Sequence, residues 1–212
     1  MLKLLYKELT LSAHPNLYVF MFMGALLLVP DYPFGVVFLF GMLGPYITVF
    51  YDRETRDTYF TALLPIRKRD AVTGKCLLFA AAQLTALVFS VPFAMLRTLL
   101  YDGNAAGIEA NAAYYGFGLI IFGVYNFIFL TQYYKTAYKA GQSFIIAALP
   151  AVLLIALMEV SAHIPSLAWL DGLDTASLIR QLPILAAGVI VYPASMLLAC
   201  RTAQRRFERV DL

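Results

Sequence analysis

The sequence predicts an all-α membrane protein with six transmembrane helices, an N-terminal amphipathic helix in the membrane interface, and a short cytoplasmic helix between spans two and three. Composition is the first reason, since 61% of the 212 residues are hydrophobic and 14% are charged. Soluble domains average about 45–50% apolar and roughly 25% charged residues. So few charges cannot cover a water-exposed surface, and we therefore expect the bilayer to solvate most of the chain.

The second reason is the length of the apolar segments. A bilayer core of about 30 Å requires roughly 20 mostly apolar residues per helical crossing. The predicted spans are residues 16–30, 32–51, 74–98, 112–134, 140–160 and 181–200. The first is short, but the orientation of the chain requires it. Without a linker or repeat to divide them, residues 1–212 are predicted to form a single transmembrane domain.

The third reason is the distribution of lysine and arginine, which concentrate on the cytoplasmic side of membrane proteins. With these six spans, 14 of the 16 basic residues fall on one side, and only Arg97 and Arg180 fall on the other. An even number of spans with both termini in the cytoplasm explains this split. The same arrangement places residues 52–73 in a cytoplasmic loop.

The N-terminal segment has an amphipathic pattern. Its apolar residues recur at helical spacing, with charged residues between them: Leu2, Leu5, Tyr6 and Leu9 alternate with Lys3, Lys7 and Glu8. Such a helix can lie in the membrane interface with its apolar face down. A frayed tail that leads into the first span is the alternative.

Enzyme and cofactor motifs are absent from the sequence. It contains no GxxxxGK[ST], HExxH or GxSxG motif, and Cys76 and Cys200 are too few and too far apart for a metal-site pattern. We therefore expect no catalytic, cofactor or metal site in this chain. The net charge of +3 does not indicate a nucleic-acid partner. The spans also lack ionisable residues at mid-depth, which disfavours a proton-driven pump but leaves sodium coupling open.

The fourth span carries an aromatic stripe. Its members follow spacings of three, four and seven residues and are Tyr115, Phe122, Tyr125, Phe129 and Tyr133, with Asn126 alongside. One interpretation is a wall of a substrate pathway. The other is helix packing together with aromatic belts at the two membrane interfaces.

The loop between spans two and three contains a predicted amphipathic helix. The segment Asp52–Leu64 is charged early and apolar late, with Tyr59 and Leu63, and Phe60 and Leu64, four residues apart. Early acidic residues suit a helix N-terminus. We expect the following proline to end this helix and Asp70 to cap the next one. A short helix held below the membrane can dock a partner, although a plain interfacial helix has a similar composition.

The same loop resembles the corresponding loop of type-2 ATP-binding-cassette (ABC) exporter permeases. The resemblance is strongest to small bacterial permeases that export antimicrobial peptides or peptide toxins, such as the phenol-soluble modulins. The shared features are an acidic residue, an aromatic residue, a Leu-Pro-Ile sequence and a basic cluster before the next span. The matching positions are Glu54, Tyr59, Leu64, Pro65, Ile66, Arg69 and Lys75. The amphipathic N-terminus and the six-span layout extend the resemblance over most of the chain.

This resemblance implies a coupling helix that fits a cleft in a separate cytoplasmic ATPase, which would bind the ATP and magnesium. The predicted coupling residues are Glu54, Tyr59, Leu63, Leu64, Pro65 and Ile66. It also implies a second permease, so that twelve helices surround one pathway in a bacterial cytoplasmic membrane, for an amphipathic peptide, lipid-like or drug-like substrate. A membrane accessory or immunity protein without transport and a sodium-coupled carrier are the alternatives.

Overall fold

The computed structural model of the chain describes residues 2–55, 57–63, 66–101 and 103–210, apart from the side chains of Arg53, Thr58, Tyr59 and Ala62. Within these ranges the chain forms helices and no strand, which confirms the predicted all-α class. The elements are α1 (Leu2–Lys7), the π-helix η1 (Glu8–Ser12), α2 (Pro15–Met21), the 3-10 helix η2 (Met23–Leu28), α3 (Gly35–Thr55), α4 (Asp57–Leu63), α5 (Lys68–Leu100), α6 (Ala112–Tyr133), α7 (Ala140–Ser161), the 3-10 helix η3 (Pro165–Leu170) and α8 (Thr175–Phe207).

Among the described residues, the five helices α3, α5, α6, α7 and α8 are long and apolar enough to cross a membrane. The predicted first span corresponds to α2 and η2, which together cover Pro15–Leu28. Because a 3-10 helix rises about 2.0 Å per residue instead of 1.5 Å, this segment reaches roughly 23 Å, which is less than the bilayer core of about 30 Å. It counts as a sixth span only when taken with the N-terminal segment Leu2–Ser12, from which it is bent by 105°.

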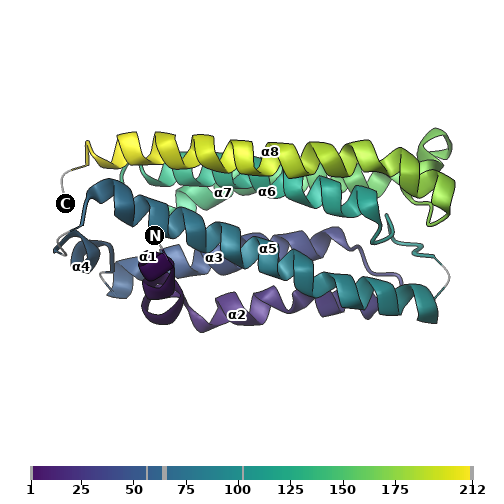
Figure 1. The fold of residues 1–212 in the computed structure, drawn as a ribbon, viewed down its shortest axis with the longest axis horizontal. Coiled ribbons are helices and arrows are strands. Elements are labelled where there is room, and N and C mark those ends of the chain that lie inside the picture. Colours follow the sequence, from purple (N-terminus) through teal and green to yellow (C-terminus); the bar gives the residue numbers. More distant parts are fainter. Residues whose placement is uncertain (1, 56, 64–65, 102, 211–212) are drawn as a thin grey trace.

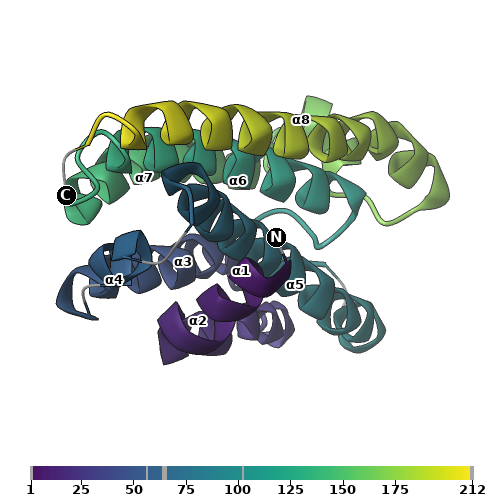
Figure 2. The same cartoon turned by 60° about the vertical axis from the view of Figure 1, so that its left-hand side comes forward.

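The helices form two groups. Figure 1 shows α2, α3 and α5 on one side and α6, α7 and α8 on the other, and Figure 2 shows the same division after rotation. Helix α6 packs against α7 and α8 and also contacts α3 and α5. Helices α1 and α4, the first turns of α5 and the last turns of α8 lie toward one end of the molecule, which we call the α4 end (Figure 1). The segment 103–111 and η3 lie at the opposite end (Figure 1).

Two helices extend well beyond the predicted spans. Helix α5 begins at Lys68 rather than at residue 74, and α8 covers Thr175–Phe207 rather than 181–200. Hydropathy marks only the apolar part of a helix, whereas backbone hydrogen bonding continues into its charged ends. Most of the predicted loop 52–73 is accordingly helical. The expectation that Asp70 caps α5 is wrong, because Arg67 is the N-cap residue and Asp70 lies in the first turn.

Small residues allow α6 and α8 to approach closely. A Cβ atom added at Gly188 would lie 2.4 Å from the carbonyl oxygen of Gly116, so the two backbones touch at these glycines. Close backbone approach at small residues is a common way for helices to pack in membranes, where apolar side chains gain little by leaving lipid.

Candidate functional site

Helix α4 presents its polar side chains to the protein and its described apolar side chains to the outside. Thr61 is buried and Asp57 is half-buried, whereas Phe60 is 56% exposed and Leu63 is 67% exposed. Asp57 also begins the helix, where a carboxylate interacts favourably with the partial positive charge of the N-terminus. Among the side chains that the structure describes, α4 is therefore attached to the rest of the protein by polar groups.

These polar groups belong to an ion cluster centred on Lys75 of α5. Its ammonium nitrogen Nζ lies 2.7 Å from Glu8 Oε2, 2.7 Å from Asp52 Oδ2 and 3.3 Å from Asp57 Oδ2. The three carboxylates come from η1, the last turn of α3 and the first turn of α4. Lys75 thus joins four segments of the chain through one side chain.

Lys7 joins the same cluster from α1. Its Nζ atom donates to Asp57 Oδ1 at 2.7 Å and to Thr61 Oγ1 at 2.8 Å, and it lies 3.1 Å from Glu8 Oε1. The Ser12 hydroxyl donates to Asp57 Oδ1 at 2.9 Å. The N-terminal segment therefore binds α4 through two of its residues, Lys7 and Ser12. We refer to Lys7, Glu8, Asp52, Asp57 and Lys75 as the ion cluster.

The ion cluster is largely shielded from water. The exposed fractions of the side chains are 7% for Lys75, 2% for Glu8, 2% for Asp52 and 11% for Asp57. Glu8 Oε2 and Asp52 Oδ2 have no hydrogen-bond partner within the described part of the chain, so the ionic contact with Lys75 balances their burial. A buried charge that loses its partner is costly. Burial acts to raise the pKa of Asp57, but the charges of Lys75 and Lys7 outweigh it and hold this pKa below its ordinary value.

The bend of the N-terminal segment brings Glu8 to Lys75. Helix α1 and η1 pack against α5, and a Cβ atom added at Gly74 would lie 3.4 Å from Glu8 Cγ. The sequence pattern placed Lys7 and Glu8 between the apolar residues of an interfacial helix and gave them no partners, whereas the structure buries Glu8. The available signal was the presence of Asp52 and Lys75 at the ends of apolar segments, since charged groups next to the membrane are usually paired.

The predicted coupling residues occupy different positions. Glu54 is exposed in the last turn of α3, Leu63 is exposed on α4, and Ile66 is half-buried. Leu64 and Pro65 lie outside the described residues, as does the side chain of Tyr59. Phe60 is not among the predicted coupling residues, although its exposure resembles that of Leu63. The matching basic residue Arg69 is exposed and pairs with Glu208 at 2.6 Å.

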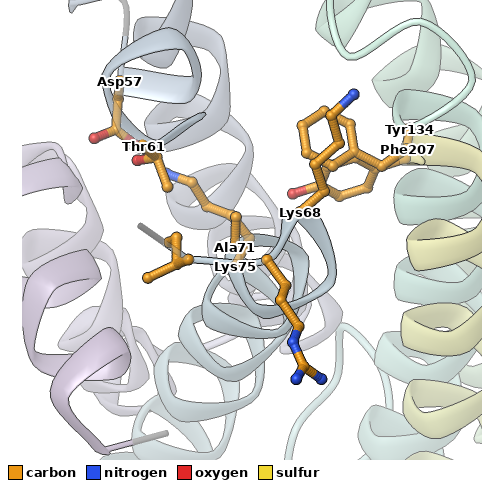
Figure 3. Close-up of a pocket in the computed structure, with 9 residues that line it drawn as sticks. Asp57, Thr61, Lys68, Ala71, Lys75, Tyr134 and Phe207 are labelled. Atoms are coloured by element: carbon orange, nitrogen blue, oxygen red, sulfur yellow. The ribbon is translucent and has the colours of Figure 1, made fainter. Parts of the chain in front are cut away.

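A cavity of about 60 Å³ lies beside the ion cluster. Figure 3 shows Asp57, Thr61 and Lys75 on one side of it and the rings of Tyr134 and Phe207 on the other. Lys68 lies between the two walls, with its ammonium group 5.8 Å from the centre of the Phe207 ring. The cavity therefore lies between α4 and the ends of α6 and α8, while the first turn of α5 contacts α8 directly through the Arg69–Glu208 pair.

The predicted pathway residues lie in and around the interior of one chain. Phe122, Tyr125 and Phe129 are buried against α3, α5 and α7, and Phe129 stacks on Phe79 with ring centres 5.4 Å apart. Tyr115 is half-buried, and its hydroxyl lies 3.1 Å from that of Ser90. These contacts show helix packing, and the residues can line a pathway only if the helices around α6 move apart. A pathway role stays a prediction.

Asn126 belongs to a buried hydrogen-bonded group at mid-depth. The Asn126 and Gln83 amides pair reciprocally at 2.7 and 2.9 Å, and the Tyr192 hydroxyl donates to Gln83 Oε1 at 3.0 Å. The group connects α5, α6 and α8. Since polar groups in hydrocarbon must be satisfied internally, these contacts account for uncharged polar residues within predicted spans.

Comparison with known proteins agrees with this architecture. Residues 3–204 match the family model described as "ABC-2 family transporter protein". None of the curated proteins or solved structures searched matches the chain significantly. Because the family model covers nearly the whole chain, including the ion cluster, α4 and the candidate membrane spans, the chain belongs to the ABC-2 transporter family and is a membrane permease subunit of an ABC transporter.

Proposed function

We propose that this permease forms part of an exporter and that a separate cytoplasmic ATPase drives it through α4. In this proposal the ATPase binds ATP and magnesium, and both termini of the permease lie in the cytoplasm together with α4. The split of 14 basic residues against two supports this orientation.

The main observation in favour of this proposal is the arrangement of α4. Phe60 and Leu63 are exposed by 56% and 67%, while the described polar side chains of the same helix are fixed by the ion cluster. Aromatic and aliphatic side chains that fill pockets of a partner usually supply most of the binding energy of an interface. A helix held by its polar face and apolar on its outer face fits a cleft in a partner protein.

A second permease completes the pathway in this proposal. Aromatic side chains of α6 fill the space between the helices of one chain, as described above for Phe122, Tyr125 and Phe129. A passage between two chains therefore requires less rearrangement than a passage through one. The partner permease is either a second copy of this chain or a related chain, and both arrangements give twelve helices.

The proposed substrate class is an amphipathic peptide or a lipid-like or drug-like molecule. A hollow of about 480 Å³ lies between α5 and α8, and Leu84, Leu119, Val189 and Met196 contribute to its apolar lining. This volume falls within the range of roughly 300–1,000 Å³ that is typical of small-molecule sites. The hollow supports a substrate with a substantial apolar part.

The test is association with a candidate ABC ATPase subunit, and an ATPase with a phosphate-binding motif encoded by a neighbouring gene would be the first candidate. The two proteins would be co-purified in nanodiscs, and the dissociation constant would be measured for Phe60→Ala, Leu63→Ala and Glu54→Gln. We expect each true anchor to cost about 2 kcal/mol or more when truncated. Glu54 is exposed, and an exposed ion pair contributes roughly 0–1 kcal/mol, so Glu54→Gln serves as the control.

Normal membrane insertion of the variants would be checked by protease protection. If the wild-type permease binds the ATPase and all three variants bind it equally well, α4 is not the docking element. If the isolated permease hydrolyses ATP, the division of labour between two subunits is wrong.

A further inference from the structure

We propose that Lys75 is the positioning residue through which movement of α4 reaches α5. In this proposal the ion cluster is a joint between these two helices, and Lys7 fastens the N-terminal helix to it. This inference rests on the proposed function, because it assumes that an ATPase moves α4. It assigns the transmission of force inside the permease to a buried ion cluster rather than to the docking surface.

The contacts of α4 are the first argument. This helix packs against the ends of α3 and α5. Its described inward side chains are Asp57 and Thr61, and both bind ammonium groups or lie next to them. A displacement of α4 therefore acts on the carboxylate of Asp57, which lies 3.3 Å from Lys75 Nζ. Lys75 is the cluster residue that belongs to α5.

The length of α5 is the second argument. It contains 33 residues, and a helix of this length spans about 50 Å at 1.5 Å per residue. Lys75 lies in its second turn, and Arg97 lies in its last turn. Arg97 donates to the Gly103 carbonyl at 2.7 Å and lies 3.4 Å from Glu109 Oε2. A push on Lys75 is therefore applied to a helix whose far end is attached to the loop after it.

The cavity beside the cluster is the third argument. Its volume of about 60 Å³ separates Asp57, Thr61 and Lys75 from Tyr134 and Phe207. Figure 3 shows that these two groups face each other across the cavity. Interiors are otherwise close-packed, so a hollow at this place gives α4 and the Lys75 side chain room to shift toward Tyr134 and Phe207. The first turns of α5 stay bound to α8 through Arg69 and Thr73.

Lys7 gives the joint its second attachment. It holds Asp57 at 2.7 Å and Thr61 at 2.8 Å, so α4 cannot leave Lys75 without also separating from the N-terminal helix. Since Glu8 bridges Lys7 and Lys75, the N-terminal helix and α5 are held to α4 together. Movement of α4 thus carries both elements.

The experiment measures movement of the middle of α5 relative to α8 and needs no substrate. Spin labels would be attached at Val88→Cys and Ile190→Cys, after replacement of Cys76 and Cys200 by alanine. Val88 and Ile190 are exposed by 69% and 68%, on α5 and α8 respectively, and both lie away from the loop contacts of Arg97. The distance between the labels would be measured in nanodiscs with the ATPase subunit bound, with and without ATP and magnesium.

We expect ATP to change this distance in the otherwise wild-type complex. Lys75→Met removes the charge but keeps an unbranched side chain, and it should abolish the change while the dissociation constant for the ATPase stays within about threefold. The rate of ATP hydrolysis that depends on the permease should fall by about tenfold or more, within the usual range of coupling between sites. Lys75→Arg should retain most of the response because the cation is kept.

The matched control is Arg69→Met. Arg69 lies six positions before Lys75 on α5 and also pairs with a carboxylate, but its side chain is 59% exposed. Lys7→Met provides a second test variant that leaves Lys75 and its carboxylates in place, and its response should lie between those of wild type and Lys75→Met. Thermal unfolding of each isolated permease would be recorded alongside.

The outcomes distinguish the two proposals. A wild-type permease that binds no ATPase overturns the proposed function and this inference with it. A wild-type complex that responds to ATP, together with Lys75→Met and Lys7→Met variants that respond equally, overturns this inference alone. If Lys75→Met fails to fold, Lys7→Met decides: a reduced response at normal ATPase binding supports the joint, and an unchanged response refutes it.

Discussion

The two ends of this permease both bury charged side chains, but they satisfy them in different ways. At the α4 end, Lys7 and Lys75 bind carboxylates that belong to other helices. At the opposite end, the charged groups bind mainly backbone. Arg97 donates to the carbonyls of Leu27 and Gly103, and Glu159 accepts from the backbone N–H groups of Gly35 and Ile108.

The backbone contacts at the opposite end fasten the segment 103–111 and η3 onto the helices. Asp171 Oδ1 accepts from the Glu109 N–H at 2.7 Å, and the Asn111 amide donates to the Leu170 carbonyl at 2.8 Å. The Arg97 guanidinium also lies 4.7 Å from the centre of the Phe34 ring, where a cation is attracted to the ring face. Each side chain here fixes the path of a loop.

The difference suggests different mechanical roles. A side chain bonded to backbone holds one loop conformation, because the loop must change its course to release it. A cluster of side chains shared by separate helices can shift while its members stay paired. We therefore interpret the opposite end as a fixed closure and the α4 end as a joint. The following experiments test this contrast.

The largest effect is expected at Arg97. Its side chain is 2% exposed, and Arg97→Ala would leave Glu109, which is 4% exposed, without its cation. Removing one partner of a buried ion pair costs about 3–5 kcal/mol. Thermal unfolding in detergent would measure the loss of stability.

Arg180→Ala is the matched control, because Arg180 is the other basic residue predicted on that side and is exposed. An exposed substitution usually changes stability by less than about 0.5 kcal/mol. Equal losses for the two variants would contradict the interpretation of Arg97 as a structural anchor.

An intermediate effect is expected at Gly107. A Cβ atom at this position would lie 1.7 Å from Glu159 Oε2, and Glu159 cannot swing away without losing its bonds to Gly35 and Ile108. Gly107→Ala should therefore destabilise the protein by about 1–3 kcal/mol, as overpacking generally does. Thermal unfolding would be compared with that of Gly141→Ala, where the added atom lies 3.9 Å from the nearest neighbour. If Gly107→Ala and Gly141→Ala unfold at the same temperature, the loops at this end are not rigidly fixed.

The smallest effect is a pH dependence that differs between the ends. The pKa of Asp57 is lowered because Lys75 and Lys7 outweigh its burial, so its contribution to stability is fully present above the ordinary value of 3.8 and is lost as the pH falls through the lower folded value. Burial raises the pKa of Asp171, so acidification relieves a cost there instead. Acid should therefore loosen α4 first.

Spin-label mobility would be followed at Leu63→Cys on α4 and at Leu173→Cys near η3 while the pH is lowered from neutral to below 3.8. Both positions are exposed, at 67% and 42%. Mobility should rise at residue 63 before it rises at residue 173, and Asp57→Asn should remove the pH dependence at residue 63. Loosening that begins at residue 173 would reverse the assignment of the two ends.

The sequence predicted the helix that we propose as the docking element but missed the ion cluster. Asp52–Leu64 was recognisable because charged residues precede apolar ones at helical spacing, and α4 occupies Asp57–Leu63 within it. Glu8 and Lys75 are 67 positions apart in the sequence, so no local period connects them. Their contact depends on the 105° bend after Ser12, which sequence pattern does not encode.

By itself, the sequence determined that lipid surrounds most of this protein and that its secondary structure is helical. A chain with 61% hydrophobic residues must place most of its surface in lipid, and backbone groups in lipid must hydrogen-bond within helices. Only the tertiary structure decided which charges are buried and what they bind. Glu8, Asp52 and Lys75 would each be unfavourable alone in such a place, and they are tolerated because folding brings opposite charges from separate helices to within 2.7 Å.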